Sequence, residues 1–311
     1  MWIAAASMGA WRVNHTATLL PSGNVLVAGG SYGSGSLATA DLYDSGLGMW
    51  LPAASMAKAR FLHTATLLPS GKALVVGGYG DGYATTEVYD PATGTWAAAA
   101  EMAIARGGHT ATLIPSGKVL VVGGNASVGN AELYDESWGT WTWAATMATR
   151  LHHTATLLRS GSVLIAGGRD GAGGFLATAE VCDPASGTCN ATGSMTAARA
   201  QHTATLLPSG KVLITGGIPV SATAEMYDPA SGTWTRVPSM AVARYGHAST
   251  LLPSGKLLIT GGTHLLTTEL YDEVSGTWST AESPAVARNA HAATLLPSGN
   301  VLVTGGYVGS P

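Results

Sequence analysis

The chain has 311 residues, of which 42 are glycine, 11% are charged and 46% are hydrophobic, and its formal net charge is −3. Such a length allows a large hydrophobic core in one domain or two. The balanced charge, without a basic run, excludes nucleic acid and a polybasic membrane surface as the main partner. Glycine, proline or serine interrupts every apolar run before it reaches the length of a membrane span, and residues 1–10 carry no recognisable signal peptide.

One motif recurs seven times along the chain and organises it. Each copy resembles His-Thr-Ala-Thr-Leu-Leu-Pro-Ser-Gly, and a Gly-Gly pair begins fourteen residues after its histidine. In five copies Tyr-Asp follows, with a tryptophan seven residues after the tyrosine. The copies begin at His15, His63, His109, His153, His202, His247 and His291.

Each copy predicts four short strands in chain order. In the third copy these are residues 110–114, residues 119–122, residues 131–135 and a strand that begins at Thr140. They are apolar or β-branched runs bounded by turn sequences such as Pro-Ser-Gly-Lys. Antiparallel strands with two apolar faces, repeated at this period, are typical of propeller blades. The sequence therefore predicts an all-β fold, a seven-bladed β-propeller of four-stranded antiparallel blades that occupies residues 1–311 as a single domain.

The Gly-Gly, Tyr-Asp and Gly-Thr-Trp elements, in this order and spacing, resemble the kelch repeat. The Met-x-x-Ala-Arg segment that leads into the copies resembles the bacterial and galactose-oxidase-like branch of that family. This resemblance covers essentially the whole chain and implies a seven-bladed propeller. It implies no single function, because the fold hosts enzymes, glycan binders and protein-interaction modules.

The two ends of the chain are expected to share one blade. Trp2 precedes Met8 by six residues, as Trp50 precedes Met56, so the chain begins in the fourth strand of the blade that starts at His291. Pairing the N- and C-terminal strands would close the ring and remove an exposed edge. Only five residues follow Gly306, and they hold no Tyr-Asp strand. We therefore expect the last blade to be incomplete at its C-terminal end, with the chain forming part of a longer protein or the third strand coming from elsewhere.

Two cysteines replace the two aromatic residues of one repeat. Cys182 stands in the tyrosine place and Cys189 in the tryptophan place, and a four-residue turn between them would set the two side chains opposite each other. Directly opposed residues are close enough for a disulfide. The alternative is a pair of small buried free thiols. We favour the disulfide, which would indicate an extracellular or cell-surface protein because disulfides persist in oxidising compartments.

The loops differ between the two faces of the predicted disc. The turns within hairpins are short and alike, whereas the loops after Gly-Gly place eight to thirteen residues before the next tyrosine or cysteine. Variable loops on a rigid scaffold are the usual place of recognition. We expect the ligand to bind on the face formed by these loops and the links between blades.

An arginine stands three residues before each repeat histidine and is a candidate for ligand binding. The set could form a cationic funnel for anionic groups. The alternative is that each arginine pairs with an acid of its own or a neighbouring blade, since acids also recur at fixed places in the repeat. The arginines are Arg12, Arg60, Arg106, Arg150, Arg199, Arg244 and Arg288.

Residues that break the repeat on the same face are further candidates, because aromatic and small polar groups suit a sugar or a peptide side chain. Ordinary loop packing is the alternative for each. The ligand-binding candidates are Trp11, Tyr32, Tyr79, Asp81, Tyr83, Arg169, Asp170, Tyr245 and His264, and Phe61, Asn125, His152, Phe175, Gln201 and Tyr307 break the pattern in the same way.

We find no catalytic constellation and expect neither a metal nor another cofactor. The repeat histidines fall one to a copy, around a wide ring rather than at bonding distance from one ion. The copper-radical oxidases related to galactose oxidase need a cysteine crosslinked to a tyrosine, and both cysteines here are expected in an outer hairpin. The sequence thus favours a non-catalytic binding propeller for a protein or glycan, then a structural or adhesive module of a larger assembly, and last an oxidase-like enzyme.

Overall fold

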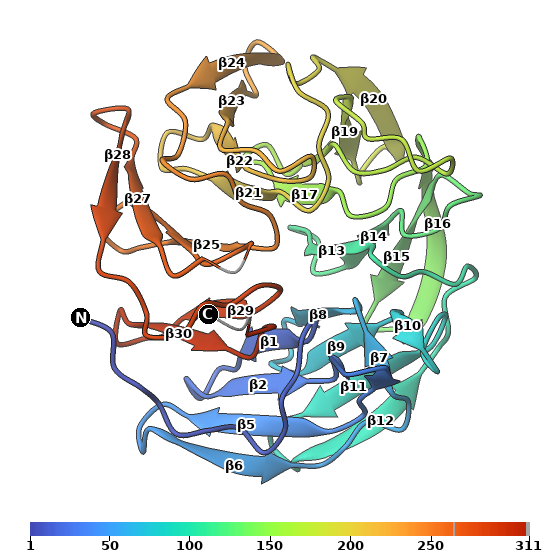
Figure 1. Ribbon diagram of the computed structural model, residues 1–311. Coiled ribbons are helices and arrows are strands. Elements are labelled where there is room, and N and C mark those ends of the chain that lie inside the picture. Colours follow the sequence, from blue (N-terminus) through green and yellow to red (C-terminus); the bar gives the residue numbers. More distant parts are fainter. Residues whose placement is uncertain (264, 309–311) are drawn as a thin grey trace.

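The computed structural model describes residues 1–263 and 265–308. Every regular element among them is a β-strand, and the sheets stand around a common axis like the blades of a propeller (Figure 1). Among these residues no helix has the length and hydrophobicity needed to cross a membrane. The expectation of an all-β propeller with four-stranded antiparallel blades is confirmed.

Six sheets have four antiparallel strands, arranged from the axis outward in chain order. The first two comprise β1 (Thr16–Leu19), β2 (Val25–Ala28), β5 (Ala40–Asp44) and β6 (Met49–Ala53), then β8 (Thr64–Leu67), β9 (Ala73–Val76), β11 (Thr86–Asp90) and β12 (Thr95–Ala99). The next two comprise β13 (Thr110–Leu113), β14 (Val119–Val122), β15 (Asn130–Asp135) and β16 (Thr140–Thr146), then β17 (Thr154–Leu157), β18 (Val163–Ala166), β19 (Ala179–Asp183) and β20 (Thr188–Thr192). The last two comprise β21 (Thr203–Leu206), β22 (Val212–Thr215), β23 (Ala224–Asp228) and β24 (Thr233–Val237), then β25 (Ala248–Leu251), β26 (Leu257–Thr260), β27 (Thr268–Asp272) and β28 (Thr277–Ala281).

Three smaller sheets have two strands each. They are β3 (Ser31–Tyr32) with β4 (Gly35–Ser36), β7 (Arg60–Phe61) with β10 (Tyr79–Gly80), and β29 (Ala292–Leu295) with β30 (Val301–Thr304). The last of these takes the position between the sixth sheet and the first, because β29 contacts both β25 and β1 (Figure 1).

The second strands form the core. Every residue of β2, β9, β14, β18, β22 and β26 is buried, because the neighbouring sheets cover both of their faces. Such strands read as continuous apolar β-branched runs rather than alternating ones. In one cluster Val119 and Val121 pack against Leu74 and Val76 of the preceding sheet. The hydrophobic core is therefore a series of layers between sheets.

The Gly-Gly pairs allow neighbouring sheets to approach closely. Gly77 has φ 58°, and a Cβ on it would lie 2.7 Å from the carbonyl oxygen of Arg106 in the next repeat. The N–H of Gly78 donates to that same oxygen at 2.8 Å. Only glycine accommodates this backbone conformation and contact. The arrangement recurs between the last repeat and the first, where Gly306 N–H donates to the carbonyl of Arg12.

A ring of backbone hydrogen bonds surrounds the axis. The residue before each repeat histidine has a positive φ, and its N–H donates to the carbonyl of the corresponding residue one repeat earlier. The ring returns on itself, since Asn14 N–H donates to Ala290 O at 3.2 Å and Ala290 N–H donates to Gly246 O at 2.9 Å. Its seven members are Asn14, Leu62, Gly108, His152, Gln201, Gly246 and Ala290.

Candidate functional site

The links between repeats and the loops after Gly-Gly lie on one face. Val13 pairs with Ser31, Leu151 with Arg169, and Asn289 with Tyr307, each pair joining a link to the loop of its own repeat. The hairpin turns within each sheet lie at the opposite ends of the strands. We call the face with the links and the loops after Gly-Gly the variable face.

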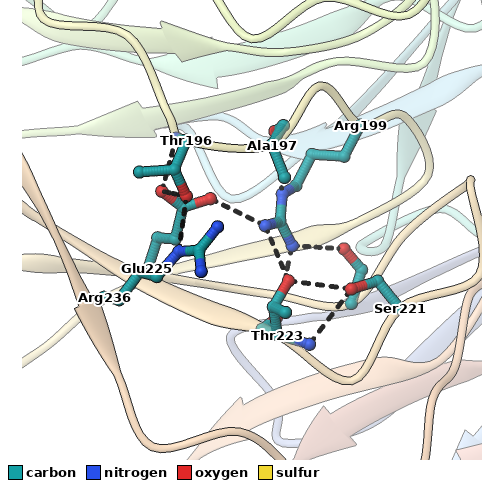
Figure 2. Close-up of polar contacts among 8 residues, drawn as sticks. Thr196, Ala197, Arg199, Ser221, Thr223, Glu225 and Arg236 are labelled. Carbon is teal, nitrogen blue, oxygen red and sulfur yellow. Dashed lines mark hydrogen bonds and ion pairs between the residues drawn. The ribbon is translucent and has the colours of Figure 1, made fainter.

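Six of the seven candidate arginines are buried beneath the variable face, each with at most 1% of its surface exposed. Figure 2 shows Arg199, whose guanidinium donates to the Gly216 carbonyl at 2.7 Å, to Thr223 and to Glu225 Oε1 at 2.8 Å. Burial lowers the pKa of Arg199, and the Glu225 carboxylate opposes that shift. Charge-assisted bonds of this kind satisfy a buried guanidinium.

The other five follow the same pattern, with ion pairs from Arg12 to Asp41, Arg60 to Glu87, Arg106 to Glu132, Arg150 to Glu180 and Arg244 to Glu269. The interpretation as a cationic funnel is therefore wrong for these six arginines, because an acidic side chain of the same repeat neutralises each guanidinium. The exception is Arg288, which is half-buried and donates to the Gly305 carbonyl.

The repeat histidines are structural. His63 Nε2 shares a hydrogen bond with Thr16 Oγ1 of the preceding repeat, and this bond recurs around the ring. Where alanine replaces that threonine, as at Ala248, the histidine bonds to a threonine on the second strand instead, here His291 to Thr260. Burial lowers the pKa of His109 to about 3, so the ring is neutral at physiological pH. Among the described residues no three His, Cys, Asp or Glu side chains are placed to hold a metal ion.

An aromatic cluster forms on the variable face of the second repeat. The rings of Phe61 and Tyr79 lie 5.6 Å apart, and Tyr83 meets Tyr79 edge-on at 5.7 Å. Tyr79 covers Gly107, where a Cβ would lie 2.6 Å from the tyrosine ring. Burial raises the pKa of Tyr79 and keeps it neutral, while Tyr83 keeps 47% of its surface exposed. We call Phe61, Tyr79 and Tyr83 the aromatic cluster.

A hollow of about 200 Å³ opens beside this cluster at the axis. Leu62, Gly108, His152 and Gln201 line it, together with repeat histidines. The ring of His152 lies over Gly108, where a Cβ would come within 2.8 Å of it. Burial, with the charge of Arg169, lowers the pKa of His152, so this imidazole can both donate and accept a hydrogen bond at neutral pH. We call this space the axial hollow.

Glycine links the two features. Tyr79 of the aromatic cluster packs on Gly107, and Gly108 lines the axial hollow, so these two glycines lie between the two features and we call them the glycine floor. Sequence reasoning missed these two glycines and Leu62 as part of a site. The signal was present, because Arg-Gly-Gly-His at 106–109 is the one copy in which both residues between arginine and histidine lack a side chain.

The remaining candidates are scattered. Arg169 lies over the ring of Phe175 at 4.6 Å, and Asp170 accepts backbone N–H groups from Ala172 and Gly174, which shapes its own loop.

Trp11 and Tyr32 are 67% and 66% exposed on the first repeat, and within the described residues neither makes a ring contact with the aromatic cluster. Asp81 is exposed next to the cluster, with its N–H bonded to Ala59, and Tyr245 is half-buried. His264 lies outside the described residues.

The two cysteines form the disulfide that the sequence favoured. Cys182 pairs directly with Cys189 across the β19–β20 hairpin, and a bond joins their sulfur atoms. Both thiols are thereby consumed in an outer hairpin.

Comparison with known proteins supports the fold. Residues 62–262, more than half of the chain, match the KLHDC2/KLHL20/DRC7 Kelch-repeats domain. The chain belongs to the kelch-repeat family. A solved structure of a copper-bound fungal alcohol oxidase of the AA5 family, described as catalytically diverse, is similar to this kelch chain with a TM-score of 0.83 and 21% identity, over 97% of this chain and 71% of the oxidase. No curated protein matches the kelch chain.

At that identity the likeness shows the fold alone. The residues of the kelch chain also do not fit the chemistry that the sequence resemblance to galactose-oxidase-like copper-radical oxidases implies. The cysteine needed for a crosslink to tyrosine is engaged in the Cys182–Cys189 bond, and the described residues bring no metal-binding group of three together.

Proposed function

We propose that residues 1–311 form one seven-bladed propeller in which β29, β30 and the N-terminal segment make up the seventh blade. The closed ring of seven hydrogen bonds supports this. So does Trp2, whose Nε1 donates to the Glu282 carbonyl at 2.6 Å. Trp50 makes the same bond to Ala6, and Trp96 makes it to Ala54, each from a fourth strand to the preceding repeat.

We propose that the protein is a non-catalytic binding propeller that recognises a glycan on the variable face. The observation that carries this proposal is the glycine floor at Gly107 and Gly108, flanked by the aromatic cluster on one side and the axial hollow on the other. Aromatic rings offer a stacking surface to the apolar face of a sugar, and a few placed polar groups give orientation. Here the polar groups are His152, Gln201 and the Tyr83 hydroxyl.

Charge favours a neutral ligand. Six arginines that would attract anions are paired with acids below the surface, and His152 is neutral. A neutral sugar therefore suits the site better than an acidic one. The disulfide supports an extracellular or cell-surface location for this binding, because such bonds persist in oxidising compartments.

A glycan array on the purified protein tests the proposal. We expect binding that Tyr83→Ala and His152→Ala each weaken by about tenfold or more, because one removes a stacking ring and the other a hydrogen-bonding group. Trp138→Ala is the matched control, since Trp138 is 81% exposed in a hairpin turn of the opposite face. Binding lost equally in the control, or binding to a protein ligand at this face without any glycan, would refute glycan recognition. Alcohol oxidation with added copper above a no-protein blank would refute the non-catalytic assignment.

A further inference from the structure

The outermost strand of the third sheet differs from its counterparts. β16 has seven residues, whereas β6, β12, β20, β24 and β28 have five each. Its pairing with β15 shifts register between Ala131 and Glu132. Trp143 pairs with Glu132, and Ala144, which follows it, is the extra residue of a β-bulge. Bulges change the direction of neighbouring side chains and are frequent beside functional sites. Trp143 lies directly before this bulge and is 57% exposed.

A groove of about 360 Å³ opens beside Trp143 on the outer rim of the ring (Figure 1). It lies between β16 and the link from the second sheet to the third, which are joined by the hydrogen bond from Trp141 Nε1 to the Ala100 carbonyl at 2.9 Å. Its volume is in the range of small-ligand sites, and it shares no lining residue with the axial hollow. We call it the outer groove and define it by Glu101, Ala103, Glu132, Trp141 and Trp143.

The outer groove contains one carboxylate that lacks a partner. Glu132 is buried and neutralised, because its Oε1 pairs with Arg106 at 2.8 Å and its Oε2 accepts the Ala103 N–H at 2.8 Å. Glu101 is exposed, and its side chain makes no hydrogen bond or ion pair among the described residues. The described residues that line the groove include no lysine or arginine. The charge of the groove therefore complements a cation.

Both the aromatic ring and the carboxylate are peculiar to the third repeat. The residue before the methionine that leads into each copy is serine or threonine wherever else that methionine occurs, and it is glutamate at Glu101. The residue two places after the fourth-strand tryptophan or cysteine is aromatic only at Trp143. The fold requires neither residue, because the other repeats are built without them. A ligand is therefore a better reason than blade packing for their meeting in one groove.

The fifth repeat shows which group fits this place. Arg236 stands at the position of Trp143, directly opposite the glutamate of the third strand. Its Nε donates to Thr196 Oγ1 at 2.9 Å, and that hydroxyl donates to Glu225 Oε2 at 2.9 Å (Figure 2). The fifth repeat thus covers its buried ion pair with a guanidinium of its own chain. In the third repeat Trp143 and Ala103 stand in the places of Arg236 and Thr196.

We propose that the outer groove binds the guanidinium of an arginine side chain carried by a partner peptide. The planar group stacks on the indole of Trp143 and donates hydrogen bonds to the Glu101 carboxylate, and its apolar stem lies against Ala103. Arginine suits these groups better than lysine, because a guanidinium both stacks on aromatic faces and binds a carboxylate through two parallel hydrogen bonds. The site is separate from the proposed glycan site and does not depend on it.

N-acetyl-arginine amide is the probe, and N-acetyl-citrulline amide, which has nearly the same shape without the charge, is its control. The indole N–H signals of Trp141 and Trp143 in nuclear magnetic resonance spectra follow the titration. We expect the arginine compound to shift both signals and the citrulline compound to bind at least about fivefold more weakly. Glu101→Gln should remove this preference, and Trp143→Ala should weaken arginine binding by about fivefold, because one removes the charge and the other the stacking surface.

Matched controls come from the hairpin turn of the same sheet. Glu136→Gln removes a carboxylate and Trp138→Ala an exposed tryptophan, and both should leave the affinity for the arginine compound unchanged. The double variant Trp143→Arg/Ala103→Thr reproduces the arrangement of the fifth repeat, so it should fold and no longer bind the probe. Circular dichroism checks that each variant is folded.

Equal affinity for the arginine and citrulline compounds, or an unchanged affinity in Glu101→Gln, would overturn the proposal. The compound n-butylguanidine tests the source of the group. Weaker binding of n-butylguanidine than of the arginine compound supports a peptide, and equal binding would overturn the peptide in favour of a free guanidinium compound. Glycan binding measured on the same variants should be unchanged, which separates this result from the outcome at the variable face.

Discussion

The six four-stranded sheets and the β29–β30 sheet are alike on the inside of the ring and different on the outside. At the axis Gly305 approaches the Arg12 carbonyl as Gly77 approaches that of Arg106, and His15 bonds to Thr304 as His63 bonds to Thr16. Farther out, Arg106 is fully buried against Glu132, whereas Arg288 has no acidic partner among residues 1–263 and 265–308. The inner half of each blade thus closes the ring, and the outer half neutralises the buried charge.

Acid should produce the largest effect, because it acts on the inner half that all repeats share. The folded pKa of His109, His202 and His247 is about 3 against an ordinary 6.5, so the unfolded state binds more protons between these values. The free energy of unfolding is largest above pH 6.5. Below that pH it decreases by about 1.4 kcal/mol per pH unit for each histidine. Thermal melts from pH 8 to pH 4 should show cooperative loss of structure well above pH 4. His291 has a pKa of about 4, so as the pH falls it should stop adding to this loss about one pH unit above the other histidines.

A melting temperature that is flat from pH 8 to pH 5 would contradict the buried neutral histidines. As a control, His109→Gln keeps a side-chain amide near Thr64 and should reduce the pH slope by the share of one histidine.

Removing an arginine should give the clearest difference in unfolding free energy between a complete repeat and the repeat that contains β29 and β30. Arg106→Ala leaves Glu132 buried without its partner, and breaking a buried ion pair costs about 3 to 5 kcal/mol. Arg288→Ala removes a half-buried group that makes one backbone hydrogen bond and no ion pair among the described residues, so it should cost less, about 1 kcal/mol. Urea unfolding of both variants measures the difference. Equal losses would mean that Arg288 is as constrained as the six paired arginines.

Glycine substitutions should show that the inner halves are equivalent. Gly77→Ala and Gly305→Ala each place a Cβ against a carbonyl oxygen, at 2.7 and 2.4 Å, with φ near 58°. Each should cost about 3 kcal/mol. Gly276→Ala is the control, because Gly276 has φ 66° and nothing within 4 Å of the added Cβ, so strain alone should cost about 1 kcal/mol. A loss for Gly305→Ala no larger than that of Gly276→Ala in urea unfolding would show that the β29–β30 sheet is loosely held.

The smallest effect is expected in the outer hairpin of the fourth repeat. Its disulfide replaces the Tyr-Trp pair of other repeats. The double variant Cys182→Ala/Cys189→Ala should lose about 2 kcal/mol, the typical value for a short closed loop. Reductant should lower the melting temperature of the original protein and leave that of the variant unchanged. Two alkylated thiols in the unreduced protein would contradict the disulfide.

The sequence predicted the strand order, the pairing of the cysteines and the face that carries the variable loops. These follow from short-range rules: apolar runs of strand length, turn residues at fixed offsets, and a four-residue turn that sets Cys182 opposite Cys189. It also offered both readings of the arginines. It did not decide between them, because the same guanidinium can face a ligand or a carboxylate, and burial decides which.

Tertiary structure alone decided which non-repeating residues meet. Tyr79 belongs to one repeat and Gly107 to the link into the next, and they touch because adjacent blades are rotated about the axis by an angle that spacing along the chain does not encode. Trp11 and Tyr32 were equally good candidates in the sequence, yet among the described residues they make no ring contact with the aromatic cluster. Repetition fixes what each blade contributes to its own core, whereas the packing between blades determines where side chains from different blades form a common surface.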